Sequence, residues 1–192
     1  MSAYRDRLRE AIGALESLSD LEASVETAAH WCVDRLAAGG KLLICGNGGS
    51  AAEAQHLAGE LVGHYRVDRM PLAAVALTAD SAVLTCIGND YAFDEIFARQ
   101  VRALGCAGDI LVVFTTSGNS PNVLKALAAA REAGMKSLAF LGGDGGKARD
   151  LADCALVVRH GDTARAQEGH QFLMHALMDL IEAGTCARSK HE

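Results

Sequence analysis

The sequence predicts an α/β protein with a doubly wound, five-stranded parallel sheet flanked by helices. Five short apolar runs lack the polar alternation of a half-exposed strand, which is typical of strands buried on both faces. Helical patterns separate the runs, and this alternation favours a parallel sheet with helices on both sides. The expected strands are residues 41–45, 73–77, 110–114, 137–141 and 154–158.

The N-terminal segment, residues 4–37, is predicted to be helical in two pieces. Apolar residues recur through it at helical spacing, and Ser19 and Asp20 mark a break with a new helix start. Such a stripe needs a surface to cover, either the sheet of its own domain or the same helices of another subunit. We expect residues 1–192 to form one domain, with residues 1–38 as an N-terminal helical extension.

The remaining helices are expected between the strands and after the last one. Pro121 is a favoured first-turn residue, and Gly134 is a typical helix stop. The predicted ranges are 50–64, 80–87, 93–103, 121–133, 147–151 and 163–184. The last of these is expected to bury one apolar face made of Phe172, Leu173, Ala176, Leu177, Leu180 and Ile181.

Composition limits the class of partner. The net charge of -6 makes general nucleic-acid binding unfavourable, because phosphate backbones need clustered Lys and Arg. No apolar run approaches the roughly 18 residues of a membrane span, and the charged N-terminus lacks a signal core. The six cysteines form no CxxC pair, so we expect reduced, buried thiols in a cytoplasmic protein without nucleic-acid or membrane partners.

Two loops rich in Gly, Ser and Thr run from a predicted strand into a predicted helix. They are GNGGS at 46–50 and TTSGNS at 115–120, and neither is a Walker loop. In open α/β sheets ligands bind beyond the carboxyl ends of the strands, where helix N-termini attract anions. The loops therefore predict a phosphate site, although tight turns with Ser caps would have the same pattern. The second loop contributes four hydroxyls, from Thr115, Thr116, Ser117 and Ser120.

Two helices carry side chains that suit a metal ion. His56 and Glu60 are four residues apart, so both project from one helix face and can share a divalent ion. A solvated or capping pair would have the same spacing. In the last helix Gln167 and His175 lie eight residues apart, about 12 Å along the axis. Spacing alone does not prefer that pair over His175 with Gln171 or Asp179.

Four motifs in order make the chain resemble the sedoheptulose 7-phosphate isomerases, or phosphoheptose isomerases, which have a sugar isomerase (SIS) domain. The resemblance covers nearly the whole length of the chain, and departures from the family pattern such as Ala166 remove no expected ligand. The motifs are GNGGSAAEAQHLAGELVG (46–63), LTCIGNDYAFDEIFARQV (84–101), TTSGNSPNV (115–123) and ARAQEGHQFLMHAL (164–177).

The resemblance implies roles for particular residues. One Zn²⁺ per subunit would be bound by His56, Glu60, Gln167 and His175, with Glu60 and His175 also forming the acid–base pair. Which of the two is the base stays open, since a carboxylate committed to zinc is a weakened base. The family forms homotetramers with active sites at subunit interfaces, which implies that the N-terminal helices, residues 1–38, are used in oligomerisation. The implied substrate contacts are Asn47, Gly48, Gly49, Ser50, Glu60, Asn89, Asp90, Thr115, Thr116, Ser117, Ser120 and Gln167.

The implied activity is interconversion of D-sedoheptulose 7-phosphate and D-glycero-D-manno-heptose 7-phosphate through a cis-enediol, the first step of ADP- or GDP-heptose synthesis. The main alternative is a non-catalytic protein of the same fold that binds a DNA replication initiator. That relative's pattern lacks the counterparts of Glu60 and His175, so their presence favours the enzyme. A sugar-phosphate sensor, and an isomerase of another ketose or hexosamine phosphate, are further alternatives.

Overall fold

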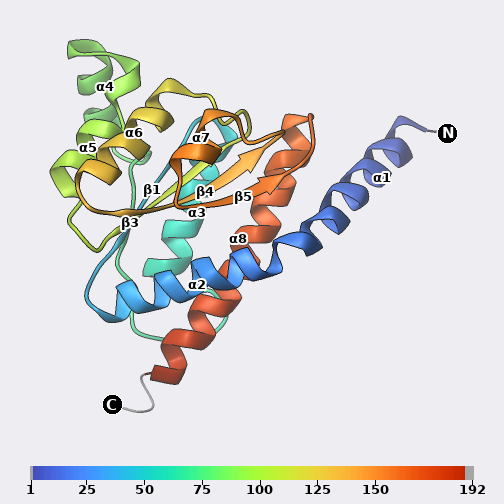
Figure 1. Cartoon of the computed structure of the whole chain (residues 1–192), viewed down its shortest axis with the longest axis horizontal. Helices are drawn as coiled ribbons and strands as arrows, with labels where there is room; N and C mark the ends of the chain where they lie inside the picture. Colours follow the sequence, from blue (N-terminus) through green and yellow to red (C-terminus); the bar gives the residue numbers. More distant parts are fainter. Residues whose placement is uncertain (1, 189–192) are drawn as a thin grey trace.

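The computed structural model describes residues 2–188, which form a parallel sheet between two layers of helices (Figure 1). The helices are α1 (Ala3–Glu16), α2 (Glu22–Ala37), α3 (Gly49–Val62), α4 (Ser81–Asp90), α5 (Ala98–Leu104), α6 (Pro121–Glu132), α7 (Gly146–Leu151) and α8 (Thr163–Arg188), with 3-10 turns η1 (Ser17–Leu21) and η2 (Phe93–Glu95). The strands are β1 (Leu42–Gly46), β2 (Ala74–Ala76), β3 (Ile110–Thr115), β4 (Lys136–Gly142) and β5 (Cys154–Val158).

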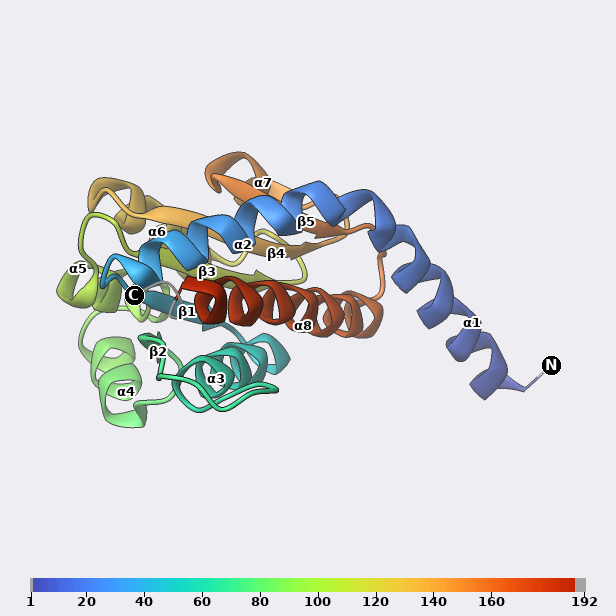
Figure 2. The same cartoon turned by 90° about the horizontal axis from the view of Figure 1, so that it is seen from below.

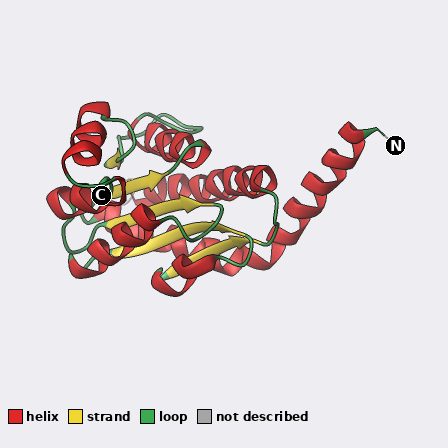
Figure 3. Ribbon diagram, turned by 90° about the horizontal axis from the view of Figure 1, so that it is seen from above, coloured by secondary structure: helices red, strands yellow, loops and turns green. Residues whose placement is uncertain are grey.

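The five strands run side by side in one parallel sheet (Figure 3), and their order is β2-β1-β3-β4-β5, which confirms the predicted fold class. From β1 the chain first proceeds to the β2 edge, then returns to β3 and continues to β5 at the other edge. The order therefore reverses between β1 and β3, whose residues Gly46 and Phe114 are paired at their carboxyl ends. This is the point where open α/β sheets bind ligands.

Both faces of the sheet are covered, as the apolar runs predicted. Alternate strand residues point to opposite faces, so Ile44 and Val112 contribute to one core and Leu43 and Val113 to the other. Helices α2, α3 and α8 cover the first face, and α4, α5, α6 and α7 cover the second (Figure 2). Helices α3 and α8, which carry the predicted metal ligands, thus lie on the same face of the sheet and contact each other.

The helix α1 extends away from the sheet (Figures 1 and 2). Its Leu8 and Ile12 are 48% and 46% exposed. On α8 the predicted apolar face is wrong for Phe172 and Leu180, which are exposed, whereas Met174 is fully buried. The apolar stripe of α8 is wider than the surface that α2, α3 and the sheet present to it, so its outer edge remains uncovered in one chain.

The six cysteine side chains are all free thiols. Cys32 and Cys45 are buried, but Cys86 and Cys106 are exposed, so the expectation of buried thiols is wrong for these two. Burial raises the pKa of Cys32 to about 12.

Among the described residues, no helix is both long enough and apolar enough to cross a membrane.

Candidate active site

The two Gly/Ser/Thr loops meet in one pocket at the switch point of the sheet. The loop after β1 and the loop after β3 both line this pocket, and Thr163 and Gln167 at the start of α8 complete its lining. Its volume is about 260 Å³. The lining residues are Asn47, Gly48, Gly49, Ser50, Phe114, Thr115, Thr116, Ser117, Ser120, Thr163 and Gln167.

Glycines occupy the places where these segments approach one another closely. Gly48 has a positive φ of 58°, a conformation that L side chains rarely adopt. A Cβ on Gly49 would collide with the amide of Gln167. A Cβ on Gly118, also at positive φ, would collide with the carbonyl of Gly145. The backbone of α3 therefore begins directly against the Gln167 side chain, which lines the same pocket.

The pocket suits an anion without help from Lys or Arg. Helices α3, α6 and α8 begin beside it, at Gly49, Pro121 and Thr163. Free backbone N–H groups and the positive ends of helix dipoles favour negative charge at such a position. The lining residues that the structure describes are all uncharged, so the groups available to an anion are amides and hydroxyls.

One residue of this pocket's support was missed by the sequence analysis. Asn122 is buried, and its amide exchanges two hydrogen bonds with Asn47: Asn122 Nδ2 donates to Asn47 Oδ1 at 2.8 Å, and Asn47 Nδ2 donates to Asn122 Oδ1 at 2.9 Å. Thr115 Oγ1 accepts a bond from the N–H of Gly118 at 3.2 Å, which folds its loop back on itself. The sequence signals for Asn122 are its place in the first turn of α6 and its inclusion in the motif TTSGNSPNV.

Beside the pocket, α3 and α8 bring together the predicted histidine and carboxylate side chains. His56 Nε2 and His175 Nε2 lie 2.9 Å and 3.4 Å from Glu60 Oε1. One ligand atom from each residue lies within 4.8 Å of the others. Glu60 Oε2 is buried and has no hydrogen-bond partner within the described part of the chain. Two imidazoles and a carboxylate with a free oxygen are a donor set that fits a divalent cation such as Zn²⁺.

The two glutamines of α8 occupy different places. The amide nitrogen of Gln171 lies 3.2 Å from His56 Nδ1 and 3.0 Å from His175 Nε2, so Gln171 joins the histidine cluster. Gln167, one turn earlier, lines the anion pocket. Tyr65 is a neighbour of the cluster that the sequence analysis missed; its ring stacks on that of His175 at 5.6 Å with an interplanar angle of 16°.

Asn89 and Asp90 are predicted contacts that this chain brings neither to the pocket nor to the histidine–carboxylate cluster, whereas the predicted contact Glu60 lies in the cluster. Asn89 and Asp90 end α4, are exposed, and contact each other, with Asn89 Nδ2 donating to Asp90 Oδ1 at 2.7 Å. The pocket is instead lined by residues that follow β1 and β3 and by the start of α8. A contact between substrate and either residue remains a prediction.

The fold and the site together define a sugar isomerase (SIS) domain. A family model described as "SIS domain" matches residues 3–142 of the chain. The phosphoheptose isomerase of Geobacter sulfurreducens is 51% identical over 174 residues, which is 91% of each protein. The chain therefore belongs to the phosphoheptose isomerase family.

Solved structures agree with this assignment. The phosphoheptose isomerase of Neisseria gonorrhoeae superposes with a TM-score of 0.89 at 47% identity, covering 94% of this chain and 97% of that one. The structure of a phosphoheptose isomerase from Francisella tularensis gives a TM-score of 0.91 at 39% identity, covering 95% and 100%. These matches favour the enzyme over the initiator-binding alternative.

Proposed function

We propose that the chain is a metal-dependent aldose–ketose isomerase that interconverts D-sedoheptulose 7-phosphate and D-glycero-D-manno-heptose 7-phosphate, as the first step of ADP- or GDP-heptose synthesis. The observation that carries the proposal is that α3 and α8 each contribute to both an anion pocket and a histidine–carboxylate cluster. Gln167 in the pocket and Gln171 in the cluster are one turn apart, about 6 Å along the axis. A sugar phosphate spans such a distance, with phosphate at one end and carbonyl at the other.

The proposed metal is one Zn²⁺ per subunit, held by His56, Glu60 and His175 with a glutamine as fourth ligand. The family resemblance assigns that ligand to Gln167, and the contacts of this chain bring Gln171 nearer to the histidines. When bound, a divalent ion at this position polarises the substrate carbonyl. The orphaned Glu60 Oε2 supports the assignment, because a buried carboxylate oxygen normally has a partner.

The reaction moves a proton between C1 and C2 and another between the two oxygens, through a cis-enediol. Glu60 and His175 are the proposed catalytic pair. His175 Nε2 and Glu60 Oε1 lie 3.4 Å apart, so both groups can face the same two substrate carbons. The assignment of base and acid between them stays open. The pocket residues hold the phosphate and so fix the reacting carbons against this pair.

We further propose a cytoplasmic homotetramer in which residues 1–38 form a helical extension of a single domain, residues 1–192. An apolar groove of about 540 Å³ lies between the N-terminal helices and α8, and it includes Leu15, Phe172 and Leu180. Covering it with another subunit would bury the exposed apolar stripe of α1 and α8. A neighbouring subunit would also be able to bring Asn89 and Asp90 to the substrate.

The test combines zinc content with turnover of sedoheptulose 7-phosphate. Glu60→Gln and His175→Gln should each abolish turnover and keep the wild-type circular-dichroism spectrum. Glu132→Gln, which changes an exposed carboxylate at the end of α6, is the matched control and should keep full activity. Near wild-type rates in either site variant would overturn the catalytic assignment. Purified wild-type protein without zinc or turnover would support the non-catalytic initiator-binding alternative.

A further inference from the structure

A buried ion pair links α8 to the segment that follows α3. Arg69 Nε lies 3.2 Å from Glu182 Oε1, and the two side chains are 5% and 7% exposed. Burying two charges costs desolvation energy that their attraction repays only partly, so such a pair is weak evidence for a purely stabilising role. Its position in the fold is more informative, because it lies between the two helices that carry the histidine–carboxylate cluster.

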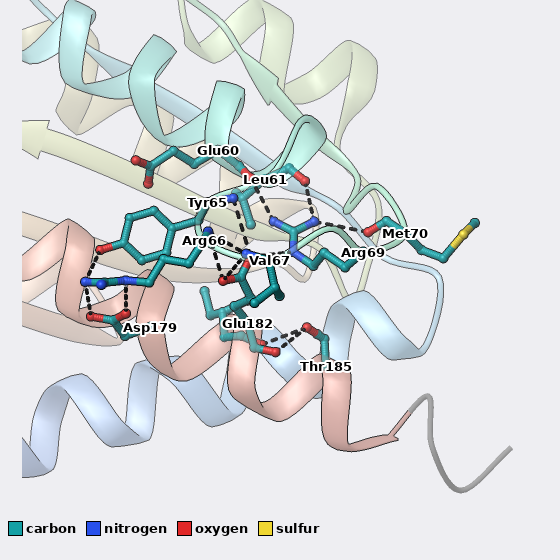
Figure 4. Close-up of polar contacts among 11 residues, drawn as sticks. Glu60, Leu61, Tyr65, Arg66, Val67, Arg69, Met70, Asp179, Glu182 and Thr185 are labelled. Carbon is teal, nitrogen blue, oxygen red and sulfur yellow. Dashed lines mark hydrogen bonds and ion pairs between the residues drawn. The ribbon is translucent and has the colours of Figure 1, made fainter.

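The carboxylate of Glu182 fixes the backbone of the segment after α3 (Figure 4). Its Oε2 accepts hydrogen bonds from the N–H groups of Arg66 at 3.1 Å and Val67 at 3.3 Å, and its Oε1 accepts from Tyr65 N at 3.4 Å. Three successive amides that belong to no helix or strand are therefore held by one side chain of α8.

The guanidinium of Arg69 holds the end of α3. Its Nη2 donates to the carbonyl of Glu60 at 2.7 Å, and its Nη1 donates to the carbonyl of Leu61 at 3.0 Å. These carbonyls belong to the last turn of α3 and have no partner within the helix itself. Figure 4 shows Arg69 lying between that turn and Glu182. The backbone that carries the proposed catalytic carboxylate is thus tied to α8.

Glu182 is also connected to the proposed catalytic histidine, His175, through Tyr65. Tyr65, held through its amide by Glu182, stacks on the ring of His175. His175 and Glu182 are seven residues apart on α8, about two turns, so they lie on the same side of the helix. One carboxylate therefore sets the position of Glu60 through Arg69 and the orientation of His175 through Tyr65.

We infer that Arg69 and Glu182 are positioning residues of the metal centre, which set the separation of Glu60 and His175 without contacting the substrate. This inference rests on the proposed metal site. Removing residues that support metal ligands typically lowers metal affinity or activity by about 10–100-fold. The anion pocket is separate from the pair, so substrate affinity through the phosphate should change little.

The experiment measures Zn²⁺ affinity of the metal-free protein by titration calorimetry, together with kcat and KM of the zinc-loaded enzyme. Glu182→Gln should weaken Zn²⁺ binding and lower kcat, each by about tenfold or more, with KM within about threefold of wild type. Arg69→Lys keeps the charge but loses the forked donor, and it should show the same pattern. It also serves as the second variant if Glu182→Gln does not fold.

Asp109→Asn is the matched control. Asp109 is also a buried carboxylate that accepts from a cation, Lys41, and from backbone amides, but its partners Lys41 and Cys106 belong to neither α3 nor α8. It should lose thermal stability to a similar degree and keep both Zn²⁺ affinity and kcat. The inference is overturned if Glu182→Gln and Arg69→Lys, like this control, lose only stability.

Zinc affinity also separates this inference from the proposed function. If wild type binds Zn²⁺ but does not convert sedoheptulose 7-phosphate, the proposed substrate is wrong, and the affinity ratio of variant to wild type still decides the positioning role. If wild type does not bind Zn²⁺, both are refuted.

Discussion

The amide pair that joins the two pocket loops gives a quantitative prediction for Asn122→Ala. The substitution removes the two hydrogen bonds exchanged with Asn47. The N–H of Val123, which donates to the Asn122 amide, retains its bond to the carbonyl of Ser120. Two net hydrogen bonds at about 0.5–1.5 kcal/mol each give a destabilisation of about 1–3 kcal/mol.

That loss should be visible in both stability and binding. For a domain of this size each kcal/mol lowers Tm by about 2–4 °C, so differential scanning calorimetry should show a decrease of about 2–12 °C. Asn47 lines the anion pocket, and loosening it should raise KM for the sugar phosphate about tenfold, equivalent to about 1.4 kcal/mol of binding. The turnover number should stay within about threefold, because the histidine–carboxylate cluster is on other elements.

Asn119→Ala, in the loop that leads into α6, is the control. Its amide donates to the carbonyl of Ser117 and accepts from the N–H of Lys147, but it is exposed, so water replaces these bonds. It should therefore change Tm by less than Asn122→Ala. Wild-type Tm and KM in Asn122→Ala would show that the amide pair does not hold the pocket together.

Three further predictions concern the backbone, the pH dependence and the thiols. Gly118→Ala should lower Tm by several degrees and raise KM, since a left-handed L residue costs about 1–2 kcal/mol and the added methyl displaces a neighbouring loop; unchanged values would refute the close approach. Burial acts to raise the pKa of Asp109, but hydrogen bonds led by that from Lys41 outweigh it and hold the pKa below its ordinary value. The carboxylate therefore stabilises the fold above the unfolded pKa of about 3.9 and loses this contribution as the pH falls through the folded value. The Tm difference between wild type and Asp109→Asn should be largest near neutral pH and shrink below about pH 4, and a constant difference would contradict this. Burial raises the pKa of Cys32 and Cys45, so a thiol reagent at about pH 8 should label them only after denaturation, and rapid labelling of the native protein would argue against their burial.

Local pattern was sufficient for most of the secondary structure. The strand predicted at 154–158 has those bounds, and the one predicted at 110–114 is one residue longer. Strand 73–77 was overextended, because only Ala74–Ala76 pairs with β1 at the sheet edge. Periodicity is a property of neighbouring residues, so it is readable without the fold. What an apolar stripe packs against is not local, and Phe172 was therefore misassigned to the buried face.

Part of the candidate site was likewise predictable from the local sequence pattern. Loops that follow parallel strands must emerge at one edge, so the sequence alone predicted that GNGGS and TTSGNS would be on the ligand-binding side. Spacing on α3 likewise placed His56 and Glu60 on one face.

Tertiary structure decided which distant side chains meet. Gln167 and Gln171 are both on the inner side of α8, and only the position of α3 shows which of them lies against the histidines. Asn122 and Glu182 were not predicted, because their partners are 75 residues or more away along the chain. Sequence periodicity specifies directions relative to one helix or strand, whereas contacts between helices depend on the packing of the whole sheet.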